Sequence, residues 1–309
     1  MSIATKLFKA IDVLFDHSQN KRMKNRYKDV KFVVEKDISY AEDEACRLDT
    51  YCVKRDGKYP VMFYIHGGGF VAGDKHHRRA ISEWCAVQGY FVVNVNYGLC
   101  PDYKFPAPLQ HLIYGLNWVG ANAEKYNLDL DKMVIAGDSA GAYYSTAVLA
   151  VVNNKELQDK IGVQTVLTFG GAWLNCGIYD IGTALGGRLP LNMGAVILDD
   201  FASIEVKDIE TYAYLDLCTP VNFVDDKYPT TFVTYAKKDI FCKGQSEKLI
   251  ERLKENGVAV EEYHSTKFAS NHCFCLNWKG KDAVTNNGRV EKFLENIAKG
   301  EKRVIIKRK

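Results

Sequence analysis

Hydrophobic and polar positions change their spacing along the chain near residue 80. Before that point, three short runs rich in β-branched and aromatic residues predict strands at 30–34, 47–53 and 61–65, and Asp56-Gly57 predicts a hairpin between the last two. After it, strand-like apolar runs alternate with segments in which apolar residues have helical spacing. The predicted helices are 80–88, 108–123, 139–152, 245–255 and 288–298, and the predicted strands are 90–95, 133–136, 163–169, 230–235 and 258–263.

This order of elements predicts the fold class. Antiparallel strands followed by alternating strands and helices indicate an α/β protein with a mixed, mostly parallel sheet and helices on both faces. The 309 residues fit a single domain, 1–309. Residues 174–228 separate two core strands by more than an ordinary connection, so we expect an insertion that caps the sheet. Residues 3–15 predict an amphipathic helix that packs on the protein itself, with docking on a membrane surface as the alternative.

Composition narrows the class of protein. Hydrophobic residues make up 47% of the chain and charged residues 26%, as in folded globular proteins, and the net charge of +3 is too small to favour nucleic acid as a partner. No apolar stretch approaches the ~18 residues of a membrane span, and the N-terminus lacks the apolar core of a secretory signal. These features, together with the nine irregularly spaced cysteines, predict a cytoplasmic protein with reduced thiols. They are compatible with a homo-oligomer.

Residues 137–141 carry the strongest chemical signal. They read Gly-Asp-Ser-Ala-Gly, directly after an apolar strand and directly before an apolar helix. A strand that turns sharply into a helix holds its corner residue, here Ser139, in strained geometry and lifts its hydroxyl clear of the sheet. Flanking glycines are needed because larger side chains would collide across the corner. The pattern predicts a nucleophilic serine.

A second glycine-rich motif, residues 66–69, reads His-Gly-Gly-Gly and follows the predicted strand 61–65. Consecutive glycines let backbone N–H groups approach a ligand, and such donors can stabilise the negative oxygen of a tetrahedral intermediate. A further donor is expected at the N–H of Ala140, because this residue follows the nucleophile. Both motifs follow their own strands, which favours one shared active site.

A nucleophilic serine needs a histidine base and a carboxylate that orients the histidine, and in this kind of fold both follow the serine. His272 lies in a loop after a predicted strand, whereas His264 ends that strand and His111 precedes the serine on a helix. Asp239 lies beyond the carboxyl end of its strand, where functional groups collect in α/β sheets. We therefore expect Ser139, Asp239 and His272 to form a catalytic triad.

These motifs resemble the hormone-sensitive-lipase-like group of α/β-hydrolase carboxylesterases. The resembling segments, which occur in the family's order, are His66-Gly-Gly-Gly-Phe70, Asn96-Tyr97, Phe105-Pro-Ala107, Gly137-Asp-Ser-Ala-Gly141, Asp239 and His272-Cys-Phe274. The resemblance implies the α/β-hydrolase fold, oxyanion donors at Gly68 and Gly69 beside Ala140, and a helical cap formed by residues 1–28 and 174–228.

The chain departs from the family pattern in two places. Gly98, Cys100 and Asp102 stand where relatives usually have Arg, Ala and Glu, and Cys273 follows the histidine where Gly is usual. Neither departure touches the expected proton transfers, although both could reshape the wall of the pocket.

The expected activity is that of a serine carboxylesterase, which hydrolyses small to medium acyl esters through an acyl-enzyme and needs no cofactor. The alternatives are an amide deacylase or acylaminoacyl-type peptide hydrolase with the same triad, and a non-catalytic ligand-binding relative, although such receptors have lost the histidine. No metal is expected, because Cys273 and Cys275 lack the spacing of zinc ligand pairs. We expect the charged run 75–79 to be solvated, His66 to brace its loop and Asp138 to bond neighbouring backbone.

Overall fold

The structure, a computed structural model, describes residues 6, 9–10, 13–14, 18–19, 21–23, 25–185, 199–202, 208, 211–212 and 214–300. Within these residues, the strands are β1 Phe32–Ser39, β2 Arg47–Val53, β3 Tyr59–Ile65, β4 Phe91–Val95, β5 Leu128–Asp138, β6 Gly171–Asn175, β7 Thr230–Ala236 and β8 Val260–Ser265. They form one sheet in the order β1-β2-β4-β3-β5-β6-β7-β8. β2 runs antiparallel to both of its neighbours, and the strands from β4 to β8 are parallel, which confirms the predicted mixed sheet.

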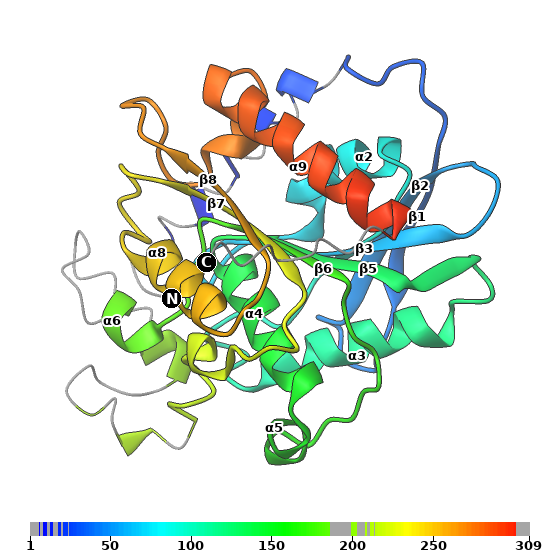
Figure 1. Cartoon of the computed structure of the whole chain (residues 1–309). Coiled ribbons are helices and arrows are strands. Elements are labelled where there is room, and N and C mark those ends of the chain that lie inside the picture. Colours follow the sequence, from blue (N-terminus) through cyan, green and yellow to red (C-terminus); the bar gives the residue numbers. More distant parts are fainter. Residues whose placement is uncertain are drawn as a thin grey trace.

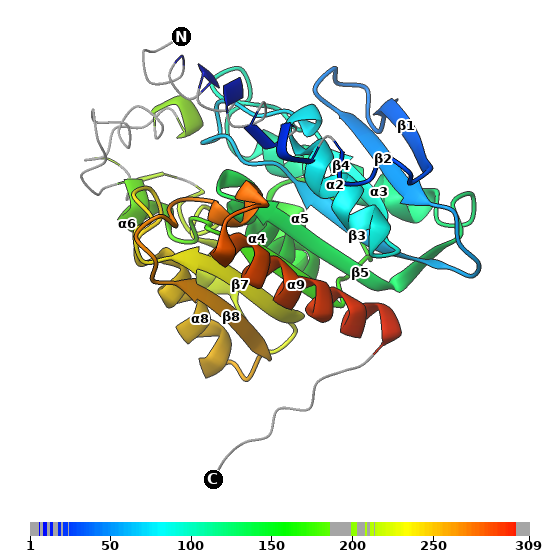
Figure 2. The ribbon, with the colours of Figure 1, turned by 90° about the horizontal axis from the view of Figure 1, so that it is seen from above.

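Helices cover both faces of this sheet (Figure 1). The helices of the described residues include α2 Arg79–Val87, α3 Ala107–Ala121, α4 Ala140–Asn153, α5 Lys155–Lys160, α6 Ile181–Leu185, α8 Gln245–Glu255 and α9 Lys281–Lys299. Short 3-10 helices accompany them at Lys75–Arg78, Pro220–Phe223 and Phe274–Asn277. α2 and α9 lie on one face, and α3, α4 and α8 lie on the other, as the view from above also shows (Figure 2).

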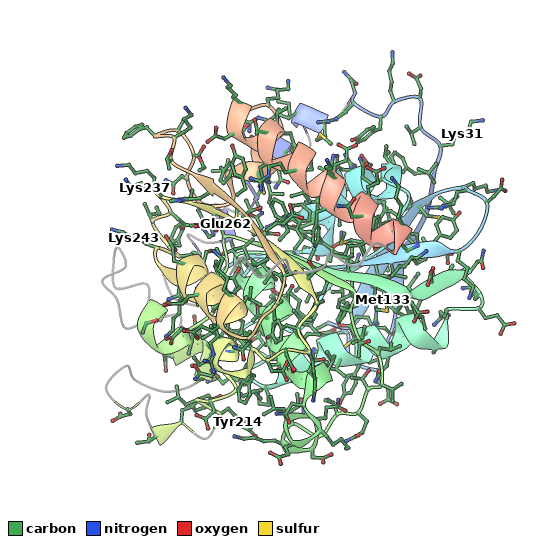
Figure 3. All side chains as sticks on the ribbon, in the orientation of Figure 1. Lys31, Met133, Tyr214, Lys237, Lys243 and Glu262 are labelled. Carbon is green, nitrogen blue, oxygen red and sulfur yellow. The ribbon has the colours of Figure 1, made fainter. Side chains whose placement is uncertain are left out.

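Each face of the sheet has its own hydrophobic core, because the central strands are apolar on both sides. In β3, Phe63 packs with residues of α3 and α4, while its neighbour Tyr64 packs with residues of α2 and α9. β5 alternates in the same way, and Met133 is fully buried in the interior of the molecule (Figure 3). A strand buried on both faces reads as a continuous apolar run, as expected for parallel strands.

The hairpin predicted at Asp56-Gly57 is wrong. Gly57 does form a turn with a φ of +78°, but β2 does not pair with β3. β4 lies between them and hydrogen-bonds to β2 on one side and to β3 on the other. The turn signal was local, whereas the pairing is decided by a strand that comes about 30 residues later.

The strand predicted at 163–169 is also wrong, because these residues form no strand and do not join the sheet. The sheet strand is β6, which begins at Gly171 and ends at Asn175. A Cβ at Gly171 would lie 3.1 Å from the Ile297 side chain of α9, so this strand starts with glycine in order to let the helix approach. Leu174 and Asn175, the first residues of the range that we assign to the cap, therefore belong to the sheet.

The structure describes only part of the N-terminal region and of the cap range. Most residues of the helix predicted at 3–15 and residues 186–198 of the cap range lie outside the described residues. Of the predicted apolar face, Leu14 is 71% exposed. Within the residues that the structure describes, no helix combines the length and the apolar character needed to cross a bilayer.

Candidate active site

Ser139 occupies the corner between β5 and α4. Its backbone has a φ of 55° and a ψ of −119°, a conformation that residues other than glycine rarely adopt. Both flanking glycines are required, because a Cβ at Gly137 would lie 2.4 Å from the backbone of Gly141, and one at Gly141 would lie 2.1 Å from the carbonyl oxygen of Ile65. The N–H of Ser139 donates to the carbonyl of Asn175 in β6, at 2.9 Å, which ties the strained corner to the sheet.

The structure brings together the three residues of the predicted triad. The His272 Nε2 atom lies 2.8 Å from Ser139 Oγ, and its Nδ1 atom lies 2.8 Å from Asp239 Oδ2. Ser139 is 100 residues from Asp239, and His272 is a further 33 residues along the chain, so only the fold unites them. A carboxylate that accepts the Nδ1 proton leaves the Nε2 lone pair facing the serine hydroxyl, which is the arrangement for removing its proton.

Asp239 is held as a carboxylate. Its Oδ1 atom accepts the N–H groups of Phe241 and Cys242, each at 2.9 Å, while Oδ2 faces His272. Burial alone would raise the pKa of Asp239, but the His272 charge, its hydrogen bond and the two backbone N–H groups together hold that pKa below its usual value. Asp239 is only 4% exposed, whereas the neighbouring Lys237 and Lys243 point outward (Figure 3).

The glycine loop lies against the serine corner. A Cβ on Gly67 would lie 2.5 Å from the carbonyl oxygen of Asp138, so the loop approaches closer than any side chain would allow. Gly68 and Gly69 have φ values of +137° and +61°, and in the described part of the chain their N–H groups donate to no protein acceptor. The N–H of Ala140 belongs to the first turn of α4, where helices leave their donors unpaired. These N–H groups are available to bind a negative oxygen.

His66 contacts its own loop. Its Nδ1 atom lies 2.8 Å from the carbonyl oxygen of Gly67, and its ring stacks on Tyr97 with a centroid distance of 4.6 Å. The Tyr97 hydroxyl donates to the His66 carbonyl at 2.8 Å. These contacts agree with the bracing role expected for His66.

Sequence reasoning missed the partner of Asp138. We expected its carboxylate to bond neighbouring backbone, but it accepts two hydrogen bonds from the Arg78 guanidinium and one from the Tyr64 hydroxyl, at 2.8 to 2.9 Å. Burial raises the pKa of Asp138, while the Arg78 charge and these bonds lower it, and the net effect is a pKa below the usual value. Arg78 therefore positions the residue that directly precedes Ser139.

The charged run 75–79 is not the solvated surface that we expected. The Lys75 side chain is 7% exposed and lies 2.6 Å from Asp37 and 2.7 Å from Asp49, while that of Arg78 is 3% exposed. Within this run, only His76 is exposed. The run itself, which contains only basic residues, gave no sign of this burial, because the acidic partners lie up to 60 residues away in the sequence.

Part of the cap range reaches the glycine loop. The ring of Phe201 is fully buried and lies 5.0 Å from the ring of Phe70, which directly follows the three glycines. It also stacks on Phe105 at 5.1 Å and meets Tyr143 of α4 edge-on at 6.0 Å. The Phe105 N–H donates to the Phe201 carbonyl at 3.0 Å. Residues from the range 174–228 therefore pack beside the loop that carries the candidate donors.

Fold and sheet order define the class of protein as an α/β hydrolase. The structure matches esterase B from Lactobacillus rhamnosis with a TM-score of 0.76 and 23% identity, over 96% of this chain and 97% of that one. It also matches a bacterial heroin esterase with a TM-score of 0.71 and 18% identity, over 92% and 90% of the two chains.

The chain belongs to the BD-FAE family, whose model matches residues 48–253, and thus to the hormone-sensitive-lipase-like group of α/β-hydrolase esterases. A relative in Mycobacterium tuberculosis, named probable carboxylic ester hydrolase LipM, is 25% identical over 89% of this chain and 64% of its own length. An acetyl esterase of Salmonella schwarzengrund is 27% identical over 37% of this chain and 40% of its own. The matches thus span less than two thirds of these curated relatives.

Proposed function

We propose that this protein is a serine carboxylesterase that hydrolyses small to medium acyl esters through an acyl-enzyme intermediate. The observation that carries the proposal is the unbroken chain of hydrogen bonds from Ser139 through His272 to Asp239, with 2.8 Å at each step. Membership of an esterase family supports the same bond type.

In the proposed reaction, Ser139 Oγ attacks the ester carbonyl carbon while His272 Nε2 takes the hydroxyl proton. The N–H groups of Gly68, Gly69 and Ala140 bind the oxygen that becomes negative. The intermediate collapses when the carbon–oxygen bond of the leaving group breaks and His272 gives its proton to the departing alcohol. Water then repeats the same steps on the acyl-enzyme and releases the carboxylic acid, while Asp239 stabilises the positive imidazolium in both halves.

A preference for short acyl chains is the finer part of the proposal. We assign the cap to residues 1–28 and 174–228, and Phe201 supports this assignment because it packs on Phe70 beside the glycine loop. An aromatic wall at that position shortens the space for an acyl chain. Each additional methylene gains only about 0.8 kcal/mol on burial, so a steric clash outweighs it. Relatives named acetyl esterase, and a crystal structure of esterase B with a tributyrin phosphonate, agree with this preference.

The proposal is tested with p-nitrophenyl esters from acetyl to palmitoyl and with the corresponding anilides. We expect the acetyl to hexanoyl esters to give the highest kcat/KM, and Ser139→Ala to lower kcat by at least ~10³ because covalent catalysis is lost. Ser145→Ala is the matched control, since this serine lies on the same helix and its hydroxyl only bonds the Gly141 carbonyl. A folded Ser139→Ala with nearly normal turnover would refute the mechanism, and faster cleavage of anilides than of esters would favour an amide deacylase.

A further inference from the structure

Two cysteines that are 97 residues apart in the sequence meet beside His272. Cys176 directly follows β6, and Cys273 directly follows His272. Their two sulfur atoms and a ring nitrogen of His272 all lie within 4.8 Å of one another. Both thiols are buried and free, with exposures of 0% and 3%.

The backbone at both cysteines is unfavourable for a residue with a side chain. Cys176 and Cys273 each have a φ of +50°, in the left-handed region that favours glycine. This conformation is disfavoured for any residue with a Cβ, because the Cβ lies too close to a backbone oxygen. Glycine would be less strained at both positions, and this chain has a thiol there instead. The cost at two facing positions suggests that the thiols have a use.

We propose that Cys176, Cys273 and His272 form a binding site for a thiophilic divalent cation such as Zn²⁺, and that the bound ion switches the esterase site off. Two thiolates and one imidazole are the ligands that zinc prefers. Each thiol releases its proton to solvent on binding, so one Zn²⁺ and two thiolates give a site without net charge, which lowers the cost of burying the ion. The half-buried His272 ring gives access from the esterase site.

The geometry requires only a small adjustment. Zinc bonds of about 2.3 Å to sulfur and about 2.0 Å to nitrogen, at tetrahedral angles, separate the ligand atoms by about 3.5 to 3.8 Å. Since these atoms already lie within 4.8 Å of one another, no pair has to approach by more than about 1.3 Å. The fourth position of the ion is left to water or to a substrate carboxylate.

Binding of the ion blocks the base whichever ring nitrogen it uses. An ion on Nε2 occupies the lone pair that has to accept the Ser139 proton. An ion on Nδ1 displaces Asp239 and leaves the ring proton on Nε2, so that this nitrogen can no longer act as a base. Loss of activity on binding thus rests on the proposed esterase mechanism, whereas binding itself does not.

A competing set of ligands consists of Asp239, Cys242 and His272, whose ligand atoms also lie within 4.8 Å of one another. We favour the pair of thiols for two reasons. An ion at either set replaces one hydrogen bond of His272, but an ion on Asp239 would also compete with the two backbone N–H groups that this carboxylate accepts. Two thiolates also bind a soft ion more strongly than one thiolate and one carboxylate.

Binding is measured with Co²⁺ on the Ser139→Ala protein, because cobalt bound to thiolate gives an intense near-ultraviolet charge-transfer absorption that does not depend on turnover. We expect this absorption in Ser139→Ala and its loss in the double variant that also carries Cys273→Gly. Glycine is the replacement of choice here because it tolerates the positive φ of this position. If that variant folds poorly, Cys176→Ser removes the other thiol and should abolish the absorption as well. Cys242→Ala, which replaces a buried cysteine near Asp239 outside the proposed site, is the matched control and should keep the absorption.

Inhibition is measured by titrating Zn²⁺ into the ester assay and reversing it with a chelator, with each variant compared with its own metal-free rate. We expect Cys273→Gly to need more than about tenfold more Zn²⁺ for half inhibition, since even the loss of a supporting residue weakens a metal site by that factor. Absence of the cobalt absorption from Ser139→Ala would overturn the proposal. So would its loss in Cys242→Ala with retention in Cys273→Gly. Failure of the esterase mechanism itself would instead leave Ser139→Ala active, with the cobalt absorption intact.

Discussion

Arg78 is the residue whose replacement tests most directly how the serine corner is held in place. Arg78→Ala would leave the Asp138 carboxylate buried without its guanidinium partner, next to Ser139 in sequence. The Asp138 side chain is 2% exposed and that of Arg78 is 3% exposed, so water cannot easily replace the lost bonds. We expect the variant to be markedly less stable than the wild type and to lose activity because the corner shifts.

The size of the effect follows from these contacts. Removing one partner of a buried ion pair costs about 3–5 kcal/mol. Counting the two charge-assisted hydrogen bonds from Nε and the terminal nitrogen at about 1.5–3 kcal/mol each gives a similar range. Because folded domains are stable by only about 5–15 kcal/mol, a large part of the total would be lost. The expected decrease in Tm is roughly 6–20 °C, at about 2–4 °C for each kcal/mol.

Urea unfolding followed by tryptophan fluorescence measures the loss, and the next residue in the chain provides the control. Arg79→Ala removes the same side chain from a half-exposed position, 3.5 Å from Glu83, and should cost no more than about 1 kcal/mol. The double variant Arg78→Ala with Asp138→Asn should lose less than the sum of the single changes, because no buried charge is then left alone. Equal losses for Arg78→Ala and Arg79→Ala, or fully additive effects in the double variant, would refute the reasoning.

Further expectations concern the donors, the triad, the pH dependence and the cap. Gly68→Ala should lower kcat by roughly 10²–10³ with little change in KM, because its Cβ would lie 2.0 Å from the Ala72 carbonyl oxygen and displace a candidate donor. Asp239→Asn should lower kcat by about 10⁴ at pH 7 in a folded protein, and full activity would remove Asp239 from the triad. The pKa of Asp138 is lower in the folded protein than its usual value of 3.8. The ionised carboxylate therefore stabilises the fold fully above about pH 4, and this contribution is lost as the pH falls through the folded pKa. Below about pH 4, the urea midpoint of Asp138→Asn should fall less than that of the wild type. Phe201→Ala should raise kcat/KM for octanoyl relative to acetyl esters, and an unchanged ratio in a chain-length series would separate this ring from the acyl pocket.

The sequence predicted the parts of the fold that depend on local pattern. Runs such as 91–95 and 245–255 were found almost to the residue, because strand-like and helical spacing of apolar residues is a short-range property. β6 was misplaced because its residues are all buried and it begins at the second of two glycines, whereas the burial of the preceding residues 163–169 alternates as in a strand although they pair with no strand. Extended backbone alone does not make a sheet, since a neighbouring strand must supply the hydrogen bonds.

The candidate site was predictable to the extent that motifs mark it. The glycine loop and the serine corner have fixed local sequences, and strand order suggested where an aspartate and a histidine would follow. The ion pair between Arg78 and Asp138 and the meeting of Cys176 with Cys273 have no such signature. Both join residues at least 60 positions apart in the sequence, and their burial is decided by tertiary packing.

The order of strands in the sheet has a consequence for the synthesis of the protein. From β3 through β5, β6, β7 and β8, each new parallel strand is added beside the one before it, in the order in which a ribosome would release them. Ser139 and the glycine loop can then take shape on β3 and β5, while His272 arrives only after β8. On the proposed mechanism, a growing chain would hold a nucleophile without a base until the segment that follows β8 has emerged. Recovery of ester hydrolysis during refolding would therefore report the last step of sheet assembly rather than the first.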